Sequence, residues 1–274
     1  MKHIYQARLP GEKQALKGVS FCVQKGKILG IIGATGSGKS TLVQHINGLL
    51  QPSSGKILLN GEDIWADKKK IRQVRFKVGL VFQNPEHQLF DSSVKSDISY
   101  GPRNMELSEE EIEKRVEFAA RLCKVSEDLL EKSPFELSGG QKRRVAIAGV
   151  VAMQPEVLIL DEPTAGLDPR GRDEIMENLA HLQQESGMTM IIVSHSMDEV
   201  AKYCDDIIVM SDGKIAINGP TREVYAQADK LHNLSLDVPE VAAIFKLLKD
   251  GGVKVGSVLT MDEAKDEIRR ILSV

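Results

Sequence analysis

The sequence predicts an α/β protein with a parallel sheet, an antiparallel β flap, an inserted α-helical subdomain and a small C-terminal helical extension. Short apolar runs, several without polar alternation, alternate with helical patterns, as is typical of strands buried on both faces under helices. A helix-rich stretch interrupts this alternation between residues 108 and 154. The sheet strands are expected at 27–33, 77–82, 157–160, 189–194 and 207–210.

The antiparallel flap is expected near the start of the chain. The stretches "VSFCVQKG" at 19–26 and "GKILLNGEDI" at 55–64 alternate apolar and polar residues and contain turn dipeptides. Such patterns predict strands of hairpins with one buried face. Between them, a helical pattern opens at the glycine-rich stretch 33–41 and lasts until Pro52.

Helix-start signals define the inserted subdomain. Ser108 with Glu111 fits a capping box, and Ser138 with Gln141 fits another one at the start of "GQKRRVAIAGVVAM". After about residue 225 a smaller unit follows, with one amphipathic helix near 238–252 and a second one beginning at Thr260. We therefore expect a main domain over 1–225, with its helical subdomain at about 88–154, and an extension over 226–274.

Composition excludes several classes of function. A chain of 274 residues with 42% hydrophobic and 27% charged residues is typical of one or two ordinary globular domains. Its formal net charge of −3 provides no global basic field, so no nucleic-acid partner is expected. The cysteines Cys22, Cys123 and Cys204 lie far apart, which disfavours a disulfide framework or a zinc knuckle and fits a reducing cytosol.

No membrane-directed segment is expected in the sequence. The first residues lack the apolar core of a signal peptide, and no run approaches the ~20 apolar residues of a membrane span. If the protein serves a membrane process, we expect the membrane part to be another chain.

The stretch "GATGSGKST" at 33–41 follows an expected strand and opens a helix, which is the context that the phosphate-loop motif G-x-x-x-x-G-K-[ST] requires. Glycines let successive N–H groups converge on phosphate oxygens, and the helix N-terminus adds the positive end of its dipole. Lys39 supplies a charge for the β- and γ-phosphates, and the Ser40 hydroxyl a ligand for Mg²⁺. The expected nucleotide-binding residues here are Gly33, Thr35, Gly36, Ser37, Gly38, Lys39, Ser40 and Thr41.

Two other interpretations compete with a nucleoside triphosphatase. The dinucleotide motif G-x-G-x-x-G fails because Thr41 stands at its third glycine position. The adjacent acids of "VLILDEP" could be a solvated strand end, but they follow four apolar residues and precede Pro163. We expect Asp161 to reach Mg²⁺ and Glu162 to point at an attacking water. The sequence therefore predicts a P-loop NTPase with a RecA-like parallel sheet.

The stretch "ELSGGQKRR" at 136–144 resembles the signature of ATP-binding-cassette (ABC) ATPases. Other elements of that family follow in order: Gln83 after a strand, "LDEPTAGLD" at 160–168, and "VSH" ending at His195. The resemblance covers about residues 5 to 225. It implies ATP and Mg²⁺ as the bound groups and ATP hydrolysis as the activity.

The signature itself predicts a second anion site. Ser138, Gly139, Gly140 and Gln141 stand at a helix start, where N–H groups bind anions. The alternative is a capped helix start without further function. The family resemblance implies that this site closes over ATP held by an opposing subunit, so that two chains sandwich two nucleotides.

The resemblance also implies roles for single residues. Glu162 would polarise the attacking water, and His195 would contact the γ-phosphate. Gln83 would touch the Mg²⁺ ion and the water, which makes the expected metal ligands Ser40, Gln83 and Asp161, and the expected catalytic residues Glu162, His195, Gln83 and Lys39. Asp168 would communicate across the dimer.

Tyr5 is the aromatic residue that would stack on adenine. The alternative is a tyrosine on a fraying end. The chain departs from the family here, because the strand before this aromatic is shortened to "MKHI".

The organisation of the chain narrows the ABC subclass. DNA-repair relatives separate their motifs by long coiled coils, translation factors carry two cassettes, and exporters usually fuse a membrane domain. None of these fits, which leaves a stand-alone subunit of an importer. The stretch "FQNPEHQLFDSSV" at 82–94 resembles the ATPases of energy-coupling factor transporters, which import vitamins and transition-metal ions. The loop "YQARLPGEKQAL" at 5–16 is similar to the second of their two ATPase paralogues.

This resemblance implies partners. They are a second ABC ATPase, a paralogue or a copy, in a head-to-tail dimer, a transmembrane scaffold and a substrate-capturing membrane subunit. The location would be cytoplasmic, peripheral on the membrane. The segment after Gln83, with His87 and Phe90, would lie at the groove that receives the scaffold. The extension 226–274 would help to hold two ATPases together, or else merely cover the cassette. A non-transport ABC ATPase and an ATPase of another importer class are the alternative functions.

Overall fold

A computed structural model describes residues 1–5 and 11–272. Its centre is a six-stranded sheet in which five neighbouring strands run parallel and the edge strand β10 pairs antiparallel with β9. The strands in spatial order are β10 (Lys214–Pro220), β9 (Asp206–Ser211), β3 (Ile28–Gly33), β8 (Thr189–Val193), β7 (Val157–Asp161) and β6 (Val78–Val81). All five apolar runs are therefore strands, as predicted.

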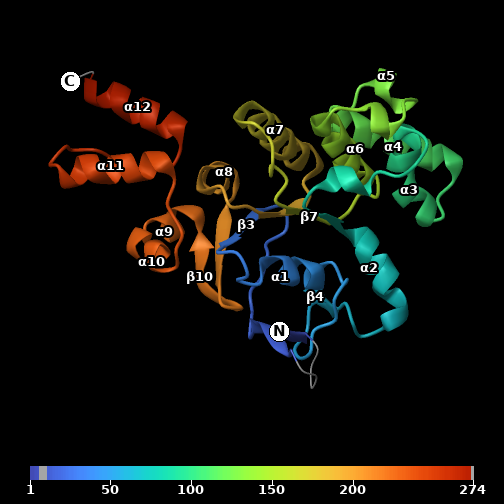
Figure 1. Cartoon of the computed structure of the whole chain (residues 1–274), viewed down its shortest axis with the longest axis horizontal. Coiled ribbons are helices and arrows are strands. Elements are labelled where there is room, and N and C mark those ends of the chain that lie inside the picture. The colour runs from blue at the N-terminus through green and yellow to red at the C-terminus, as the bar shows by residue number, and fades with distance from the viewer. Residues whose placement is uncertain (6–10, 273–274) are drawn as a thin grey trace.

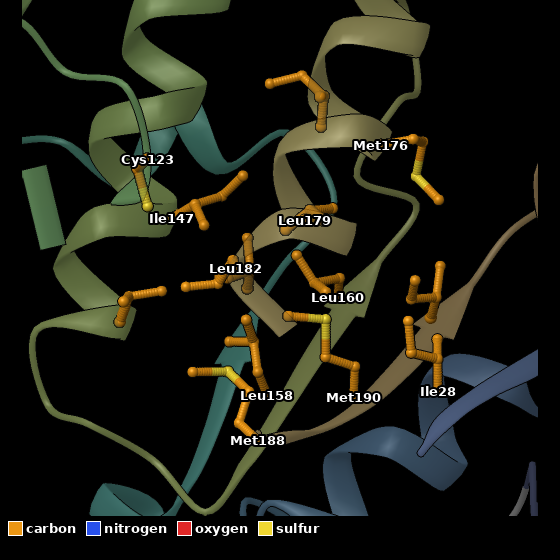
Figure 2. Close-up of a cluster of buried hydrophobic side chains, with 14 of the residues drawn as sticks. Ile28, Cys123, Ile147, Leu158, Leu160, Met176, Leu179, Leu182, Met188 and Met190 are labelled. Atoms are coloured by element: carbon orange, nitrogen blue, oxygen red, sulfur yellow. The ribbon is translucent and has the colours of Figure 1, made fainter. Parts of the chain in front are cut away.

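The sheet is buried on both faces, which explains its apolar runs. On β3, Ile28 and Ile32 join one buried cluster while Leu29 and Ile31 join the other. The first face packs against α7 (Pro169–Ser186) and α8 (Met197–Tyr203), and the second against α1 (Lys39–Ile46) and α2 (Ile71–Lys77). Figure 2 shows side chains of the first face. The sheet thus presents the carboxyl ends of its central strands at one edge, between helical layers.

A helical subdomain lies beside the β6 end of the sheet (Figure 1). It consists of α3 (Val94–Asn104), α4 (Glu109–Leu122), α5 (Glu127–Leu130) and α6 (Gly139–Val151). The predicted cap residues Ser108 and Ser138 both accept a hydrogen bond from the N–H group three residues ahead. Only Ser138 is shown with the reciprocal bond, donated by its own N–H to the Gln141 side chain.

The predicted flap is only partly strand. β1 (Lys2–Tyr5) pairs antiparallel with β2 (Lys13–Lys17), and β4 (Leu58–Leu59) pairs with β5 (Glu62–Asp63). The strand expected at 19–26 was wrong, since this described stretch has no strand. Its alternation reflects one-sided packing, because Phe21 and Val23 lie against the core below. Alternation reports a buried face but not a hydrogen-bonded neighbour.

The helix after the phosphate loop is also shorter than expected. It ends at Ile46 rather than reaching Pro52. The N–H groups of Leu49 and Leu50 then both donate to the Gln44 carbonyl, which closes a turn. Leu49 and Leu50 in this turn continue the apolar pattern of the helix, which is why the sequence predicted a longer helix.

The C-terminal part lies on the side of the sheet that carries β10, away from the helical subdomain (Figure 1). It follows α9 (Thr221–Tyr225) and α10 (Ala228–Asn233) and contains α11 (Glu240–Asp250) and α12 (Met261–Leu272). Val241, Phe245, Val258 and Ala264 form a small buried cluster of their own. Short 3₁₀ helices complete the chain at Lys68–Lys70, Pro85–Gln88 and Pro134–Glu136.

Candidate nucleotide-binding and hydrolysis site

The phosphate loop lies between β3 and α1 and depends on its glycines. Gly33 has a φ angle of 154° and Gly38 one of 104°. A Cβ atom on Gly33 would lie 2.3 Å from the Met210 carbonyl oxygen, and one on Gly38 would lie 2.9 Å from the Ala15 carbonyl oxygen. Any larger residue would push the loop out of its place. A Cβ atom on Gly36 would instead meet nothing within 4 Å, so the loop opens outward there.

The remaining loop residues differ in exposure. Ser37 is buried, its N–H donates to the Ala34 carbonyl, and its own carbonyl accepts from Gly213 N–H. Thr35 and Ser40 are exposed. Gly38 caps α1 without any side-chain hydrogen bond, so the first turn of the helix is open to an anion.

Lys39 is folded over the loop. Its Nζ atom donates to the Gly33 carbonyl at 2.7 Å and to the Ala34 carbonyl at 3.2 Å, and the residue is only 6% exposed. Burial lowers the pKa of this ammonium group, and the charges of Glu162 and Asp161 act in the opposite direction. The phosphate loop thus holds a buried cation for which a bound phosphate would be a compensating partner.

Asp161 ends β7 and is 8% exposed. Burial raises the pKa of its carboxyl group, while a hydrogen bond with Ser40 and the charge of Lys39 lower it. Among the described residues, no three or more His, Cys, Asp or Glu side chains form a metal cluster. The pair Ser40 and Asp161 fits Mg²⁺ because this ion takes few protein oxygens and completes its shell with water and phosphate.

Glu162 stands where β7 ends, with its carboxylate held from two sides. Gln83 Nε2 donates to Oε2 at 2.8 Å, and His195 Nε2 lies 2.8 Å from Oε1. Its backbone has a φ angle of 53°, a conformation that residues with a side chain rarely adopt, and its N–H donates to the Val193 carbonyl. The structure therefore brings together three of the four predicted catalytic side chains, from the ends of three neighbouring strands.

Sequence reasoning missed Glu199. Its Oε2 atom accepts hydrogen bonds from Thr164 Oγ1 and Ser194 Oγ, both at 3.0 Å, and joins the segment after Glu162 to the segment before His195. Burial raises the pKa of this carboxyl group, and the two hydroxyl groups lower it. In the sequence, Ser196 with Glu199 shows only a helix-start signal. Glu199, Glu162 and His195 all line a cavity of about 440 Å³.

The signature residues lie at the start of α6, in the helical subdomain, whereas the phosphate loop leads into α1 under the sheet (Figure 1). Ser138 and Gly139 are exposed, and Cβ atoms on Gly139 and Gly140 would meet nothing within 4 Å. The Gln141 side chain is engaged with Ser138 N–H at 2.9 Å. The signature is thus an open helix start that faces solvent in the single chain.

Asp168 caps α7. Its Oδ1 atom accepts from Gly171 N–H at 2.7 Å, and the residue is exposed. Pro169 follows as the first helical residue, a position that proline favours. The structure thus gives Asp168 a local role and leaves it accessible to a second subunit.

Tyr5 lies at the end of β1, near the phosphate loop. Its hydroxyl group is 3.2 Å from Thr41 Oγ1, and its ring meets the His3 ring edge-on at a centroid distance of 4.5 Å. His3 in turn meets His45 of α1 at 4.4 Å. Tyr5 is paired with Lys13 in the β1–β2 ladder and is 37% exposed, so its ring is supported on one side and open on the other. The loop "YQARLPGEKQAL" at 5–16 falls partly at 6–10, outside the described residues.

Comparison with known proteins agrees with this geometry. The family model described as "ABC transporter" matches residues 16–165. A curated relative from Clostridium tetani (strain Massachusetts / E88), named energy-coupling factor transporter ATP-binding protein EcfA2, is 49% identical over 275 residues, covering 100% of this chain and 96% of the relative.

Two solved structures are similar to this chain. The structure of cbiO1 from Clostridium perfringens, described as part of the ABC transporter complex cbiONQ, has a TM-score of 0.76 and 44% identity, covering 89% of this chain and 96% of that one. The ATP-binding cassette MJ0796, described as a dimer in a post-hydrolysis state bound to ADP and Pi, has a TM-score of 0.72 and 28% identity, covering 81% and 96%. The chain is an ABC ATPase and belongs to the family of energy-coupling factor transporter ATP-binding proteins.

Proposed function

We propose that this ATPase drives the uptake of vitamins or transition-metal ions through separate membrane subunits of an energy-coupling factor type importer. The proposal rests on the position of Gln83, which holds the Glu162 carboxylate together with His195. The chain continues from Gln83 directly into the segment that we expect to contact the membrane partner. The test is to purify the complex by a tag on this chain, insert it into lipid vesicles, and measure ATP-dependent uptake of vitamins or transition-metal ions. Vesicles that hydrolyse ATP without any uptake would contradict it.

Hydrolysis would follow from the positions of the chain's own groups. Lys39 and the open first turn of α1 would bind the phosphates of ATP. Ser40, Asp161 and Gln83 would hold Mg²⁺, which neutralises charge on the phosphates. Glu162 would orient and polarise the attacking water, and His195 would hold that carboxylate and contact the γ-phosphate.

We infer that each site is completed by a second ATPase subunit. The open helix start at the signature is suited to bind an anion, but it lies on α6, whereas the chain's phosphate loop leads into α1. Asp168 is likewise exposed, at the start of α7. The similar MJ0796 cassette is described as a dimer bound to ADP and Pi. A head-to-tail pair would place Ser138, Gly139 and Gly140 of one chain over the nucleotide of the other.

A Ser138→Arg variant tests this arrangement. The arginine would add bulk and charge at the exposed helix start, so we expect ATP-driven dimerisation to be lost while ATP still binds the single chain. Size-exclusion chromatography with light scattering measures the first, and a fluorescent ATP analogue the second. The matched control is Ser108→Arg, at the exposed cap of α4 in the same subdomain. An ATP-driven dimer with normal yield in Ser138→Arg would contradict the composite site.

The segment after Gln83 borders a groove suited to an apolar helix of a membrane partner. The groove has a volume of about 360 Å³ and lies between α2, α3, α6 and the end of the 3₁₀ helix Pro85–Gln88. Phe90 and Tyr100 line it and meet edge to face at 5.0 Å, yet they remain 60% and 51% exposed. Two large exposed aromatic side chains in one groove indicate a binding site for another protein.

We expect Phe90→Ala to weaken assembly with the membrane subunits more than ATP hydrolysis by the ATPase alone. Removing an aromatic anchor from an interface typically costs about 2 kcal/mol or more of binding free energy. The measurement is the yield of membrane subunits that copurify with this chain, beside the ATPase rate without them. Phe135→Ala is the control, because Phe135 is 71% exposed outside the groove. Equal assembly of both variants and wild type would contradict the docking groove.

We also propose that the C-terminal extension contacts the second ATPase. Its helices α11 and α12 leave many apolar side chains exposed: Ile244, Leu247, Leu248, Met261, Ile268 and Leu272. Such a face favours a protein partner over solvent.

Among the residues that the structure describes, no helix has the length and apolar character to cross a membrane. We propose that the protein reaches the cytoplasmic face of the membrane through its partners.

A further inference from the structure

Arg143 lies on α6, two residues after Gln141 of the signature, and is only 2% exposed. We infer that it is a positioning residue for hydrolysis, one that ties the turn after Glu162 to the segment that follows Gln83. In the sequence it stands within a basic run, a pattern that usually indicates a solvated helix face. The structure instead buries its guanidinium group against two other parts of the chain.

The first contact of Arg143 is with the turn that carries Glu162. Its Nη1 atom donates to the Pro163 carbonyl at 3.1 Å and to the Ala165 carbonyl at 2.9 Å. The same turn is closed by Ala165 N–H, which donates to the Glu162 carbonyl at 3.1 Å. Glu162 has a rarely adopted φ angle of 53°, and such a conformation persists only where its surroundings hold it. By binding the Pro163 and Ala165 carbonyls, Arg143 helps to keep Glu162 in this conformation.

The second contact is with the segment after Gln83. Arg143 Nη2 lies 3.2 Å from Glu86 Oε2, and the side chains are 3% and 23% exposed. Glu86 sits in the 3₁₀ helix Pro85–Gln88, directly after Asn84, whose φ angle is 56°. A buried guanidinium group left without its carboxylate is strongly unfavourable. Arg143 must therefore follow Glu86 when this 3₁₀ helix moves.

These two contacts form a continuous route from the docking groove to the hydrolysis site. The groove is lined by Gln88, the last residue of the 3₁₀ helix that carries Glu86, and by Leu89 and Phe90, which follow it. A partner that shifts this helix would pull on Arg143 and through it on the carbonyls beside Glu162. The claim that a partner acts along this route rests on the proposed docking function. The positioning of Glu162 by Arg143 does not depend on it.

A double-mutant cycle with Arg143→Lys and Glu86→Gln tests the inference on the full-length ATPase. Lysine keeps the charge but loses the two-pronged geometry, so we expect kcat to fall by about ten- to a hundredfold, as for a displaced catalytic group. KM for ATP should stay within about twofold, because the phosphate-binding residues are untouched. Glu86→Gln should lower kcat by a smaller factor. The double variant should be no slower than Arg143→Lys alone, which shows that the two residues act together.

The control is Glu174→Gln, which removes the carboxylate partner of the adjacent Arg144 at 3.0 Å. It should leave kcat unchanged. A normal kcat in Arg143→Lys, or effects of the two changes that simply multiply, would overturn the inference. If Arg143→Lys does not fold, Glu86→Gln decides alone, and an unchanged kcat in it would overturn the link. Failure of wild type to assemble with membrane subunits would contradict the proposed transport function but not this kinetic coupling.

Discussion

Replacing Glu162 by glutamine is expected to remove nearly all ATP turnover while ATP still binds. The amide keeps the size of the side chain but cannot polarise water, and a general base of this kind typically contributes ~10²–10⁴ in rate. Lys39 and the phosphate loop are unchanged, so nucleotide affinity should be retained. The variant should therefore accumulate as an ATP-bound closed dimer. Single-turnover hydrolysis and the mass of the ATP-bound species measure both effects.

The comparison for Glu162→Gln is the same change at Glu174. Glu174 is a half-exposed carboxylate paired with Arg144 on the helical surface, away from the hydrolysis cavity. It should show wild-type turnover. Wild-type turnover in Glu162→Gln would mean that another group activates the water.

Lys39→Ala is expected to lose most of the affinity for ATP. Lys39 is buried and its Nζ atom donates to the Gly33 carbonyl, so the side chain holds its charge where the phosphates would bind. Loss of one partner from a buried charge pair typically costs about 2–5 kcal/mol of binding free energy. Isothermal titration with ATP measures the change.

Lys77→Ala serves as the control for Lys39→Ala. Lys77 forms a part-exposed ion pair with Glu156 at 3.1 Å, and such pairs contribute little. We expect its ATP affinity to equal that of wild type. Undiminished ATP binding by Lys39→Ala would contradict the assignment of the phosphate loop.

The sheet and the phosphate loop could be predicted because their physical requirements leave strong marks in the sequence. Strands buried on both faces need continuous apolar runs, and the close approach of Gly33 to the Met210 carbonyl oxygen admits no side chain. The acids at the end of β7 also stand out, because they are adjacent, follow four apolar residues and precede Pro163. Predictions of this kind rest on local constraints.

The contacts between distant segments could not be predicted in the same way. Glu199 and Arg143 act through partners far along the chain, and their own neighbourhoods show only a helix start and a basic run. The strand expected at 19–26 failed for a related reason, because pairing depends on a neighbouring strand that local alternation does not reveal. The resemblance assigned Gln83, His195 and Glu162 to one site, and the neighbouring positions of β8, β7 and β6 explain how they meet there.

Purification of the complex from solubilised membranes through a tag on this chain tests the account most directly. The predicted result is a complex that contains a second ABC ATPase and membrane-spanning subunits and that hydrolyses ATP. The Glu162→Gln form should assemble equally well without hydrolysing ATP. A chain that hydrolyses ATP but is recovered from membranes without any membrane-spanning subunit would contradict the account.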